Sequence, residues 1–395
     1  MIRYLPVKKP WSNPMYFYAL PTHQQAKRVA WDYLKSLVPK EWLKSAPSES
    51  ELLIRTIFGS TLHLVGMDKP QRIEGNQWDG GVVDESCDQK PGHFDRSIRP
   101  ALSHRNGWCW RIGVPKRWGP GAAEFKSIWE EWGSGKFGDN YESYTWPSGD
   151  ILLPDEIEDV KRTLDQKDFE EQYGAIWQGT SGLVFYAFDE KLNVSDNVKY
   201  DPGRPLLVGS DFNVDPMAWV VGQYYDPGPI NKSGPEFHFF DEIFLRNTNT
   251  QKTLNHLHHK YQGHQMGWRF LGDATARARN TRASSSDYAQ ILNDLRFLNS
   301  KVMYPQSNPA RADRFAASNA ILCNAAGQRR CYLHPKCVNL IQDLSSRAYE
   351  PGSREPDDHD DIGHITDAFG YVIHYLKPIA AAPYTSVPQI YVDVA

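Results

Sequence analysis

The chain has 395 residues, which is long enough for two domains with separate hydrophobic cores. Its net charge of −4 excludes a global basic field of the kind that attracts nucleic acid, although local basic stretches can still bind DNA around an acidic centre. Its 5 cysteines are an odd number at irregular spacing, which argues against a disulfide framework, and no apolar run approaches the ~18 residues of a membrane span.

The first half of the chain alternates between strand and helix patterns. Thr22 is a suitable N-cap for a helix that follows the first strand, because its hydroxyl can accept a backbone N–H. We expect strands over residues 14–20, 51–57, 61–65 and 111–116, and helices over residues 21–37 and 124–132. This alternation is typical of an α/β domain.

Another short strand of the first half ends in paired acids, Asp84 and Glu85. In an α/β domain that hydrolyses nucleotides, the first acid of such a pair holds Mg²⁺ through water and the second polarises the attacking water. The alternative is an ordinary strand followed by an acidic turn. Arg72, upstream of this strand, either faces the phosphates or is an arginine at the core edge with no such role.

A glycine-rich stretch, Gly133-Ser-Gly-Lys136, does not form a phosphate loop. The complete pattern requires a Gly five residues before its final Gly and a Ser or Thr after the Lys. Glu130 and Phe137 occupy those two positions. The stretch is therefore interpreted as a loop after the end of a helix.

Gly- and Pro-rich segments lie between about residues 179 and 205 and indicate a domain boundary. The first domain is expected to end before these segments and the second to begin after them. We predict a first domain over residues 1–180, a linker over 181–204, a second domain over 205–380 and a C-terminal tail over 381–395.

The second half has the element order of an RNase H-like nuclease domain with a mixed sheet: three antiparallel strands, then alternating helices and strands. Its first strand ends in Asp211, its fourth strand ends in Asp273, and its last helix carries Asp367. Hard cations prefer oxygen ligands, and a pair of ions stabilises both oxygens of a phosphoryl displacement. We therefore expect these acids to hold two Mg²⁺ or Mn²⁺ ions, with Asp211 bridging both.

The start of the last helix offers several candidates for the third ligand. Asp360, His364 and Asp367 share one helix face, and Asp367 is the preferred ligand. His364 is a ligand, a support for a ligand, or a phosphate contact, and Asp361 is the rival carboxylate. Without a metal role, acids here would stabilise the helix N-terminus. Asp215, after the first strand, is a possible auxiliary ligand.

Two basic segments are candidates for DNA binding. Arg277, Arg279 and Arg282 follow the fourth strand directly, and they either hold the DNA backbone or belong to a solvated loop. Lys116 and Arg117 follow a strand of the first half and are weaker candidates for contact with DNA or a partner subunit.

The spacing Cys331-x₂-His334-x₂-Cys337 is one possible zinc pattern. It has no second ligand pair at the usual distance. The preferred interpretation is a strand over residues 330–333 that runs into a helix near Pro335.

Taken together, these motifs resemble the large terminase subunit of tailed bacteriophages, over nearly the whole chain. The specificity lies in their order and spacing, since each is weak alone. The similar segments are Pro21-Thr-His-Gln-Gln-Ala26, Val82-Val-Asp-Glu85, Gly113-Val-Pro-Lys116, Gly209-Ser-Asp-Phe-Asn213, Leu271-Gly-Asp273 and His364-Ile-Thr-Asp-Ala368. In the family these are, in order, a segment after the first ATPase helix, the Walker B strand, the coupling motif and three acidic nuclease motifs.

The resemblance implies a DNA-packaging motor made of a P-loop-type ATPase domain and an RNase H-like nuclease domain. It implies ATP with Mg²⁺ in the first domain and two Mg²⁺ or Mn²⁺ ions in the second. It also implies cleavage of concatemeric double-stranded DNA in the host cell cytoplasm. The implied partners are DNA, a small terminase subunit, a portal protein and other copies in a ring on the portal, with no membrane.

The sequence departs from the family in two places. No Walker A loop precedes the Pro21-Thr22 segment, so we expect an incomplete ATPase domain, from a truncated or split product, with negligible ATP hydrolysis by this chain alone. Val114 stands where the family often has Thr or Ser. The alternatives are an RNase H-like recombination or transposition nuclease, and a non-catalytic remnant that binds portal, small subunit or DNA.

Overall fold

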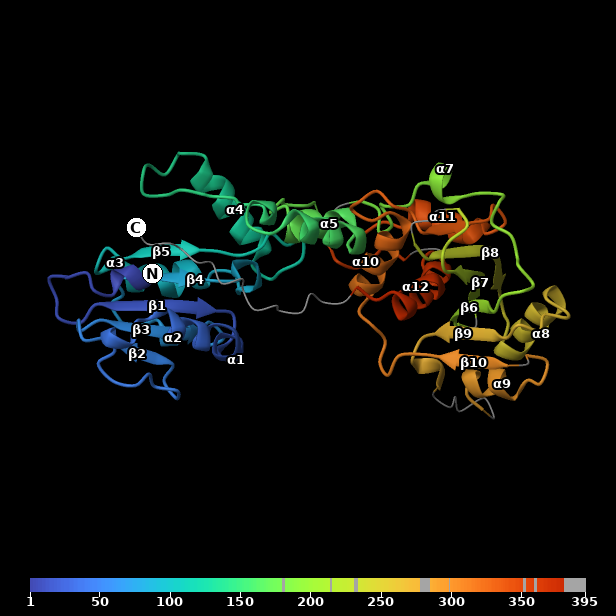
Figure 1. Cartoon of the computed structure of the whole chain (residues 1–395), viewed down its shortest axis with the longest axis horizontal. Coiled ribbons are helices and arrows are strands. Elements are labelled where there is room, and N and C mark those ends of the chain that lie inside the picture. The colour runs from blue at the N-terminus through green and yellow to red at the C-terminus, as the bar shows by residue number, and fades with distance from the viewer. Residues whose placement is uncertain are drawn as a thin grey trace. The chain divides into compact units, whose positions relative to one another are not determined.

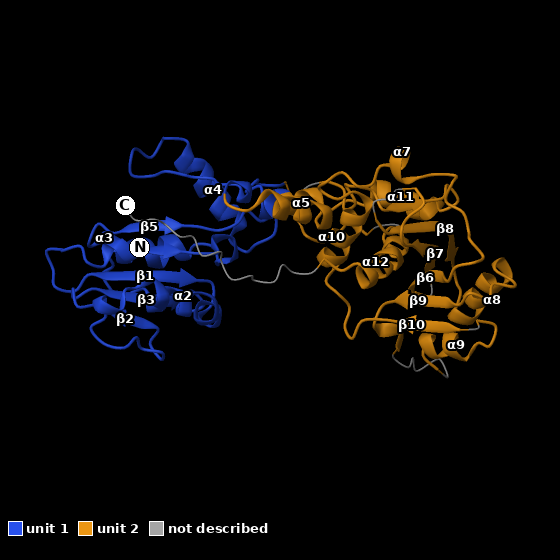
Figure 2. Ribbon diagram, in the orientation of Figure 1, with its two compact units in different colours: residues 1–150, 170–178 blue, residues 151–169, 179–395 orange. Residues whose placement is uncertain are grey.

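The computed structural model describes residues 1–179, 182–213, 215–230, 234–277, 285–297, 299–350, 353–358 and 361–379 (Figure 1). The chain divides into two compact units, which Figure 2 colours separately. Unit 1 comprises residues 1–150 and 170–178, and unit 2 comprises residues 151–169 and 179–395. Each unit has its own sheet. Among the described helices, none is both long enough and apolar enough to cross a bilayer.

Unit 1 is built on a five-stranded sheet in the order β2-β3-β1-β4-β5. Its strands are β1 (Met15–Leu20), β2 (Leu53–Arg55), β3 (Thr61–Gly66), β4 (Gly80–Val83) and β5 (Trp108–Arg111). All pairs are parallel except that of β2 with β3 at the edge. A parallel sheet is normally buried on both faces, and β1, β3 and β4 accordingly consist largely of buried residues.

Helices and turns cover this sheet and form two large apolar cores, and a third, small cluster contains Phe125. One core centres on Trp31 and Leu34, and the other on Trp78 and Ile98. The helices of this unit are α1 (His23–Ala26), α2 (Asp32–Leu37), α3 (Arg99–Ser103) and α4 (Ala122–Gly133), and α6 (Gln166–Gln172) ends in it. The predicted N-cap is confirmed, because the Thr22 side chain accepts the Gln25 N–H at 3.1 Å.

The strand predicted over residues 111–116 is wrong in its bounds. The strand ends at Arg111, and residues 113–116 form a loop. Pro115 has no N–H to donate to a neighbouring strand. Gly113 is needed for close approach, since a Cβ there would lie 2.9 Å from the Ser86 nitrogen.

Unit 2 is built on a six-stranded sheet in the order β10-β9-β6-β7-β8-β11. Its strands are β6 (Leu206–Asp211), β7 (Met217–Tyr225), β8 (Glu236–Leu245), β9 (Trp268–Gly272), β10 (Ser300–Met303) and β11 (Cys331–Leu333). The first three form an antiparallel meander, β9 pairs parallel with β6, and β10 pairs parallel with β9. The RNase H-like arrangement predicted from the element order is thus confirmed, with β11 added parallel to β8.

The last helix packs directly on the first strand of this sheet. The helices here are α5 (Pro154–Thr163), α7 (Glu190–Asn193), α8 (Thr250–Lys260), α9 (Asp287–Asn293), α10 (Arg311–Leu322), α11 (Val338–Ser346) and α12 (His364–Leu376). Gly209 in β6 permits the contact, because a Cβ there would lie 2.5 Å from Val372 and 2.6 Å from the Ala368 carbonyl oxygen. The glycine of the first acidic motif therefore fixes how closely α12 approaches the strand.

The units differ from the predicted division of the chain in two segments. Residues 151–169, expected in the first domain, group with unit 2. The predicted linker over residues 181–204 supplies buried core side chains of unit 2, among them Val184, Phe185 and Val198. Its glycines and prolines punctuate a folded segment, which composition alone does not distinguish from a linker.

The Cys331–Cys337 segment forms the preferred strand and helix. Cys331 begins β11, and Cys337 is the N-cap of α11. The buried Cys337 thiol donates to the Phe239 carbonyl oxygen at 3.5 Å. Within the described ranges no zinc-type cluster includes these residues.

Candidate active site

The three acids predicted as metal ligands lie at one edge of the sheet of unit 2, where β6 and β9 have their carboxyl ends. β6 ends at Asp211, and its register with β9 sets Ser210 beside Gly272, so that Asp273 follows at the adjacent position. α12 packs on β6 and carries Asp367 in its first turn. Two parallel strands and one helix thus contribute one acid each.

Asp211 is influenced electrostatically by both other acids. Its side chain is 12% exposed. Burial raises the pKa of Asp211, a hydrogen bond with His364 lowers it, and the charges of Asp367 and Asp273 raise it further. Like charges at close range disfavour ionisation, so a cation placed among these carboxylates would be stabilised.

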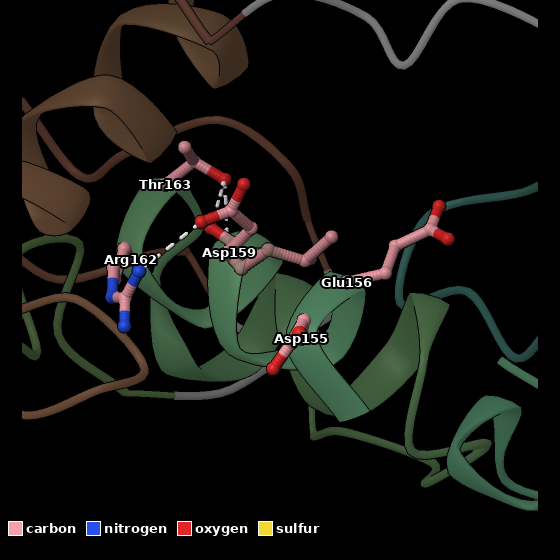
Figure 3. Close-up of a pocket in the computed structure, with 6 residues that line it drawn as sticks. Asp155, Glu156, Asp159, Arg162 and Thr163 are labelled. Carbon is pink, nitrogen blue, oxygen red and sulfur yellow. Dashed lines mark hydrogen bonds and ion pairs between the residues drawn. The ribbon is translucent and has the colours of Figure 1, made fainter. Parts of the chain in front are cut away.

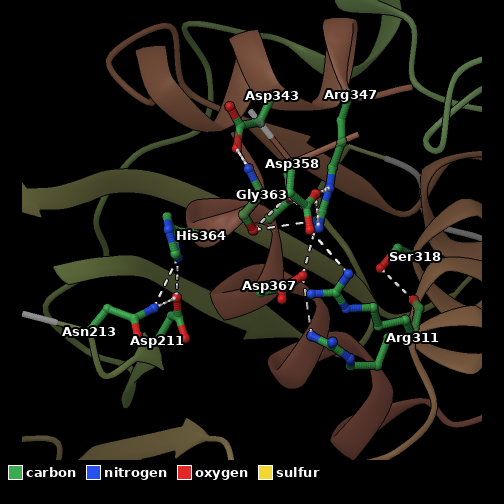
Figure 4. Close-up of polar contacts among 12 residues, drawn as sticks. Asp211, Asn213, Arg311, Ser318, Asp343, Arg347, Asp358, Gly363, His364 and Asp367 are labelled. Atoms are coloured by element: carbon green, nitrogen blue, oxygen red, sulfur yellow. Dashed lines mark hydrogen bonds and ion pairs between the residues drawn. The ribbon is translucent and has the colours of Figure 1, made fainter. Parts of the chain in front are cut away.

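Asp211 has two polar neighbours, which Figure 4 shows. Asn213 Nδ2 donates to Asp211 Oδ2 at 2.6 Å, and His364 Nδ1 lies 2.9 Å from the same oxygen. Asn213 Nδ2 is also 2.9 Å from His364 Nδ1. The hydrogen bond with Asp211 is the main cause that raises the pKa of His364. Of the three roles considered for His364, this contact favours support of Asp211.

Asp367 is held by two arginines. Arg347 Nη1 donates to Asp367 Oδ1 at 3.0 Å (Figure 4). Arg314 Nη1 approaches the same oxygen at 3.4 Å. Arg347 also pairs with Asp358, at 2.7 Å. The third acid is therefore fixed at one oxygen by cations from two different segments.

Asp273 caps the short 3₁₀ helix that follows β9, Thr275–Arg277. Its Oδ1 accepts the backbone N–H groups of Thr275 and Ala276 at 2.8 and 2.9 Å, and the Thr275 hydroxyl at 2.8 Å. These bonds restrict the carboxylate to one orientation at the strand end.

Two other acids considered as metal ligands, Asp361 and Asp215, lie beside an arginine instead. Asp361, the rival third ligand, forms an ion pair with Arg246, and Asp215 lies 3.6 Å from the same arginine. Arg246 is 58% exposed, so this is a surface cluster. Asp360 lies outside the described residues.

The acids at this edge fit a divalent cation in chemical type. They are oxygen donors of the kind that Mg²⁺ and Mn²⁺ prefer, and the mutual repulsion at Asp211 is what a bound cation would relieve. Within the described residues, however, no three Asp, Glu, His or Cys side chains stand close enough together to hold one ion. The topology thus gathers the donors at one edge, and ligation would require their side chains to converge.

Of the three arginines predicted to bind DNA after the fourth strand, Arg277 alone is described. It is exposed and ends the 3₁₀ helix that Asp273 caps. Arg279 and Arg282 lie outside the described residues.

In unit 1, the paired acids follow β4 and have partners of their own. The Tyr18 hydroxyl donates to Asp84 Oδ2 at 2.5 Å. Lys116 donates to Asp88 at 2.5 Å and lies 3.6 Å from Glu85. Burial raises the pKa of Glu85, while Lys116 lowers it. Lys116 is therefore a cation that lies beside Glu85, the second of the paired acids after β4.

The basic residues of unit 1 that were predicted to contact phosphates, DNA or a partner form ion pairs and hydrogen bonds within this unit. Arg72 pairs with Asp68 at 3.4 Å, in a partly exposed pair. Arg117 donates its backbone N–H to Glu171 at 2.8 Å and pairs with it at 2.9 Å. Lys116 bonds to acids of the β4 edge, as described above. The structure thus gives these side chains structural partners.

Four residues of these sites received no role from the sequence. Asn213 lies inside the first acidic motif, two residues after the acid it contacts, so its position was the available signal. Tyr18, Arg314 and Arg347 contact acids far along the chain, at separations of 66, 53 and 20 residues, and no local pattern marks them.

A shallow depression on α5 lies apart from these acids in the sequence (Figure 3). A single helix lines it, with Asp155, Glu156, Asp159, Val160, Arg162 and Thr163. Arg162 and Asp159 pair at 3.2 Å there. With no second element to enclose a ligand, it is a surface feature rather than a binding site.

Comparison with known proteins agrees with this arrangement. No protein-family profile matches the sequence. The chain is 22% identical over 376 residues to the large subunit of terminase from Escherichia phage T5, covering 88% of this chain and 77% of that protein. Two structures of the large terminase from a thermophilic bacteriophage match at a TM-score of 0.50. One has 14% identity and covers 92% of this chain and 86% of the other. The second, in complex with ADP, has 15% identity and covers 92% and 87%.

Proposed function

We propose that this chain, which resembles phage terminase large subunits in sequence and in fold, is a metal-dependent endonuclease that cuts double-stranded DNA. The observation that supports the proposal is that Asp211, Asp273 and Asp367 lie at one edge of an RNase H-like sheet. Burial, together with the charges of Asp367 and Asp273, raises the pKa of Asp211, and a cation bound beside this carboxylate would favour its charged form.

In this proposal the three carboxylates hold two Mg²⁺ or Mn²⁺ ions. Bound there, the ions would supply an activated water and charge stabilisation for the leaving 3′ oxygen. Asn213 and His364 hold the Asp211 carboxylate by hydrogen bonds to its Oδ2. Arg277, which is exposed four residues after Asp273, would contact the DNA backbone, together with Arg279 and Arg282.

The test is cleavage of supercoiled plasmid DNA with Mn²⁺. Asp211→Asn and Asp367→Asn should each reduce cleavage by at least about 100-fold, because a neutral amide is a poor substitute for a carboxylate ligand. Asp361→Asn is the matched control, since Asp361 forms a surface pair with Arg246, and it should cut like the wild type.

The outcome also separates the alternatives. If Asp361→Asn abolishes cleavage and Asp367→Asn does not, the third ligand is misassigned. Equal, negligible cleavage by the wild type and Asp211→Asn, with DNA binding retained, would favour a non-catalytic binding module. Mn²⁺-dependent joining of DNA ends into a second duplex would favour a recombination or transposition nuclease.

A second proposed function is a part in nucleotide-driven DNA packaging: unit 1 would supply the acids of the hydrolysis site, and a phosphate loop would have to come from outside residues 1–395. Asp84 and Glu85 follow a strand of a parallel sheet, as the acids of a nucleotide-hydrolysing domain do, and the thermophilic phage terminase of this fold binds ADP. Residues 1–395 contain no phosphate-loop pattern, so we expect negligible ATP turnover by this polypeptide alone. Steady ATP hydrolysis that Glu85→Gln abolishes would contradict this expectation.

The partners proposed with this function are those of DNA packaging. They are DNA, a small terminase subunit, a portal protein and further copies of the chain in a ring, all acting in the host cell cytoplasm. A pull-down of this chain with the portal protein tests the assembly. If the portal protein does not bind the chain, this second function is contradicted, while the proposed nuclease function is unaffected.

A further inference from the structure

Arg347 is a fully buried cation that contacts Asp367 of the candidate active site. It is the C-cap residue of α11, and its side chain is 0% exposed. Placing a guanidinium in the interior is unfavourable unless ion pairs and hydrogen bonds compensate for the lost water. The groups that form these ion pairs and hydrogen bonds with Arg347 therefore indicate its role.

The hydrogen bonds of Arg347 join two acids and the first turn of α12. Nε donates to Asp358 Oδ1 at 2.9 Å. Nη1 donates to Asp367 Oδ1 at 3.0 Å and to the Thr366 hydroxyl at 2.9 Å. Asp358 anchors one side of the planar fork, and the other side is directed at the third predicted metal ligand (Figure 4).

Arg314 reaches the same carboxylate oxygen from a different helix. It comes from α10, its side chain is 5% exposed, and its Nη1 lies 3.4 Å from Asp367 Oδ1. The guanidinium also lies over the Tyr371 ring, 4.4 Å from the centroid. Two buried cations therefore converge on Oδ1 of Asp367, and within the described residues Oδ2 has no hydrogen-bond or ion-pair partner.

The backbone before α12 is shaped around Arg347. Gly363 has a φ of +109°, which side-chain-bearing residues rarely adopt, and a Cβ there would lie 2.7 Å from Arg347 Nη2. The Gly363 N–H donates to the buried Asp343 at 2.8 Å. The first turn of α12 is thus held at fixed distance from the guanidinium.

We propose that Arg347, with Arg314, is a positioning residue that fixes Asp367 Oδ1 so that Oδ2 is presented to a divalent cation. This inference rests on the proposed nuclease function. The convergence of a second arginine on the same oxygen, and a glycine that leaves room for the fork, indicate that the orientation of Asp367 is what is controlled.

The test is Mn²⁺ binding to the full chain, measured by calorimetry and by the paramagnetic resonance signal of free Mn²⁺. Arg347→Lys keeps the charge but loses the planar fork, so it cannot serve Asp358 and Asp367 together. We expect Mn²⁺ affinity to fall about 10-fold, as for other residues that orient a ligand. In an Asp367→Asn background, Arg347→Lys should cause no further loss, because the carboxylate to be positioned is gone.

Arg311→Lys is the matched control. Arg311 pairs with Asp358 at 3.1 Å and with Glu355 at 3.3 Å on the surface, and neither contact involves Asp367. Its Mn²⁺ affinity should equal that of the wild type. If Arg347→Lys does not fold, Arg314→Lys replaces it, since Arg314 approaches the same oxygen.

The outcomes separate this inference from the proposed function. If Arg347→Lys, or Arg314→Lys in its place, binds Mn²⁺ like the wild type while Asp367→Asn binds weakly, the positioning role is wrong and the metal site stands. If the loss persists undiminished in the Asp367→Asn background, the arginine acts on the fold in general. If neither Asp211→Asn nor Asp367→Asn alters Mn²⁺ binding, the proposed nuclease site itself is wrong.

Discussion

The two units place acids at strand ends in the same way but neutralise them differently. In unit 1 the acid edge has its own cation, with Lys116 between Glu85 and Asp88. In unit 2, within the described residues, no Lys or Arg forms an ion pair with Asp211 or Asp273. The cations there bind Asp367 on one oxygen only. A carboxylate without a lysine or arginine partner favours a bound metal ion, as proposed for unit 2, whereas Lys116 supplies a positive charge within the acid edge of unit 1.

The largest effect should come from removing the buried cation of unit 2. Arg347→Met leaves Asp358 and Asp367 without their buried partner, and breaking such a pair destabilises a fold by about 3–5 kcal/mol. Urea unfolding measures the change. Arg311→Met, which removes a 43% exposed side chain, should change stability by less than about 1 kcal/mol. Equal effects of the two variants would contradict the distinction between buried and surface arginines.

Buried titrating groups should give the two units opposite responses to pH. In unit 2, burial raises the pKa of Asp343 from 3.8 to about 6. Its stabilising contribution is therefore fully present below pH 3.8 and is lost as the pH rises through about 6. In unit 1, burial lowers the pKa of His63 from 6.5 to about 4, and so its contribution is present above pH 6.5 and is lost as the pH falls through about 4.

Asp343→Asn and His63→Gln isolate these two contributions. Each shift of about two pKa units corresponds to about 2–3 kcal/mol, at ~1.4 kcal/mol per unit. The free energy of unfolding should be measured from pH 4 to 7. Relative to the wild type, Asp343→Asn should gain stability as the pH rises, and His63→Gln should gain it as the pH falls. Parallel curves for wild type and variant would refute the corresponding shift.

The smallest effect is expected at the lysine of unit 1. Lys116→Met removes a half-buried pair with Asp88, so stability should fall by about 1 kcal/mol. The same change should raise the pKa of Glu85 further, because Lys116 is the group that lowers it. Carboxyl NMR titration of Glu85 reports this directly. An unchanged Glu85 pKa would show that the lysine does not balance this edge.

Features set by local pattern could be predicted from the sequence. The succession of strands and helices along unit 2 and the acids at the ends of β6 and β9 follow from apolar runs that stop at a carboxylate, such as the one before Asp211. The Thr22 cap was equally local. These features depend on neighbours within a few residues.

Features set by tertiary contacts could not be predicted. Arg347 meets Asp358, Thr366 and Asp367 only because α11 and α12 pack together, at separations of 11, 19 and 20 residues. Lys116 was considered for DNA contact, but its ammonium bonds to Asp88, 28 residues earlier. A charged side chain in a sequence does not reveal whether it faces solvent or a partner.

The grouping of residues 151–169 and 179–204 with unit 2 determines how this protein can be dissected. The polypeptide passes between the units three times, near residues 150, 169 and 178. A fragment that begins at residue 205 would lack Val184, Phe185 and Val198, which are buried in the unit 2 cores. Autonomous expression of unit 2 should therefore start near residue 151, and fragments that begin at the predicted domain boundary near residue 205 should be recovered as aggregates.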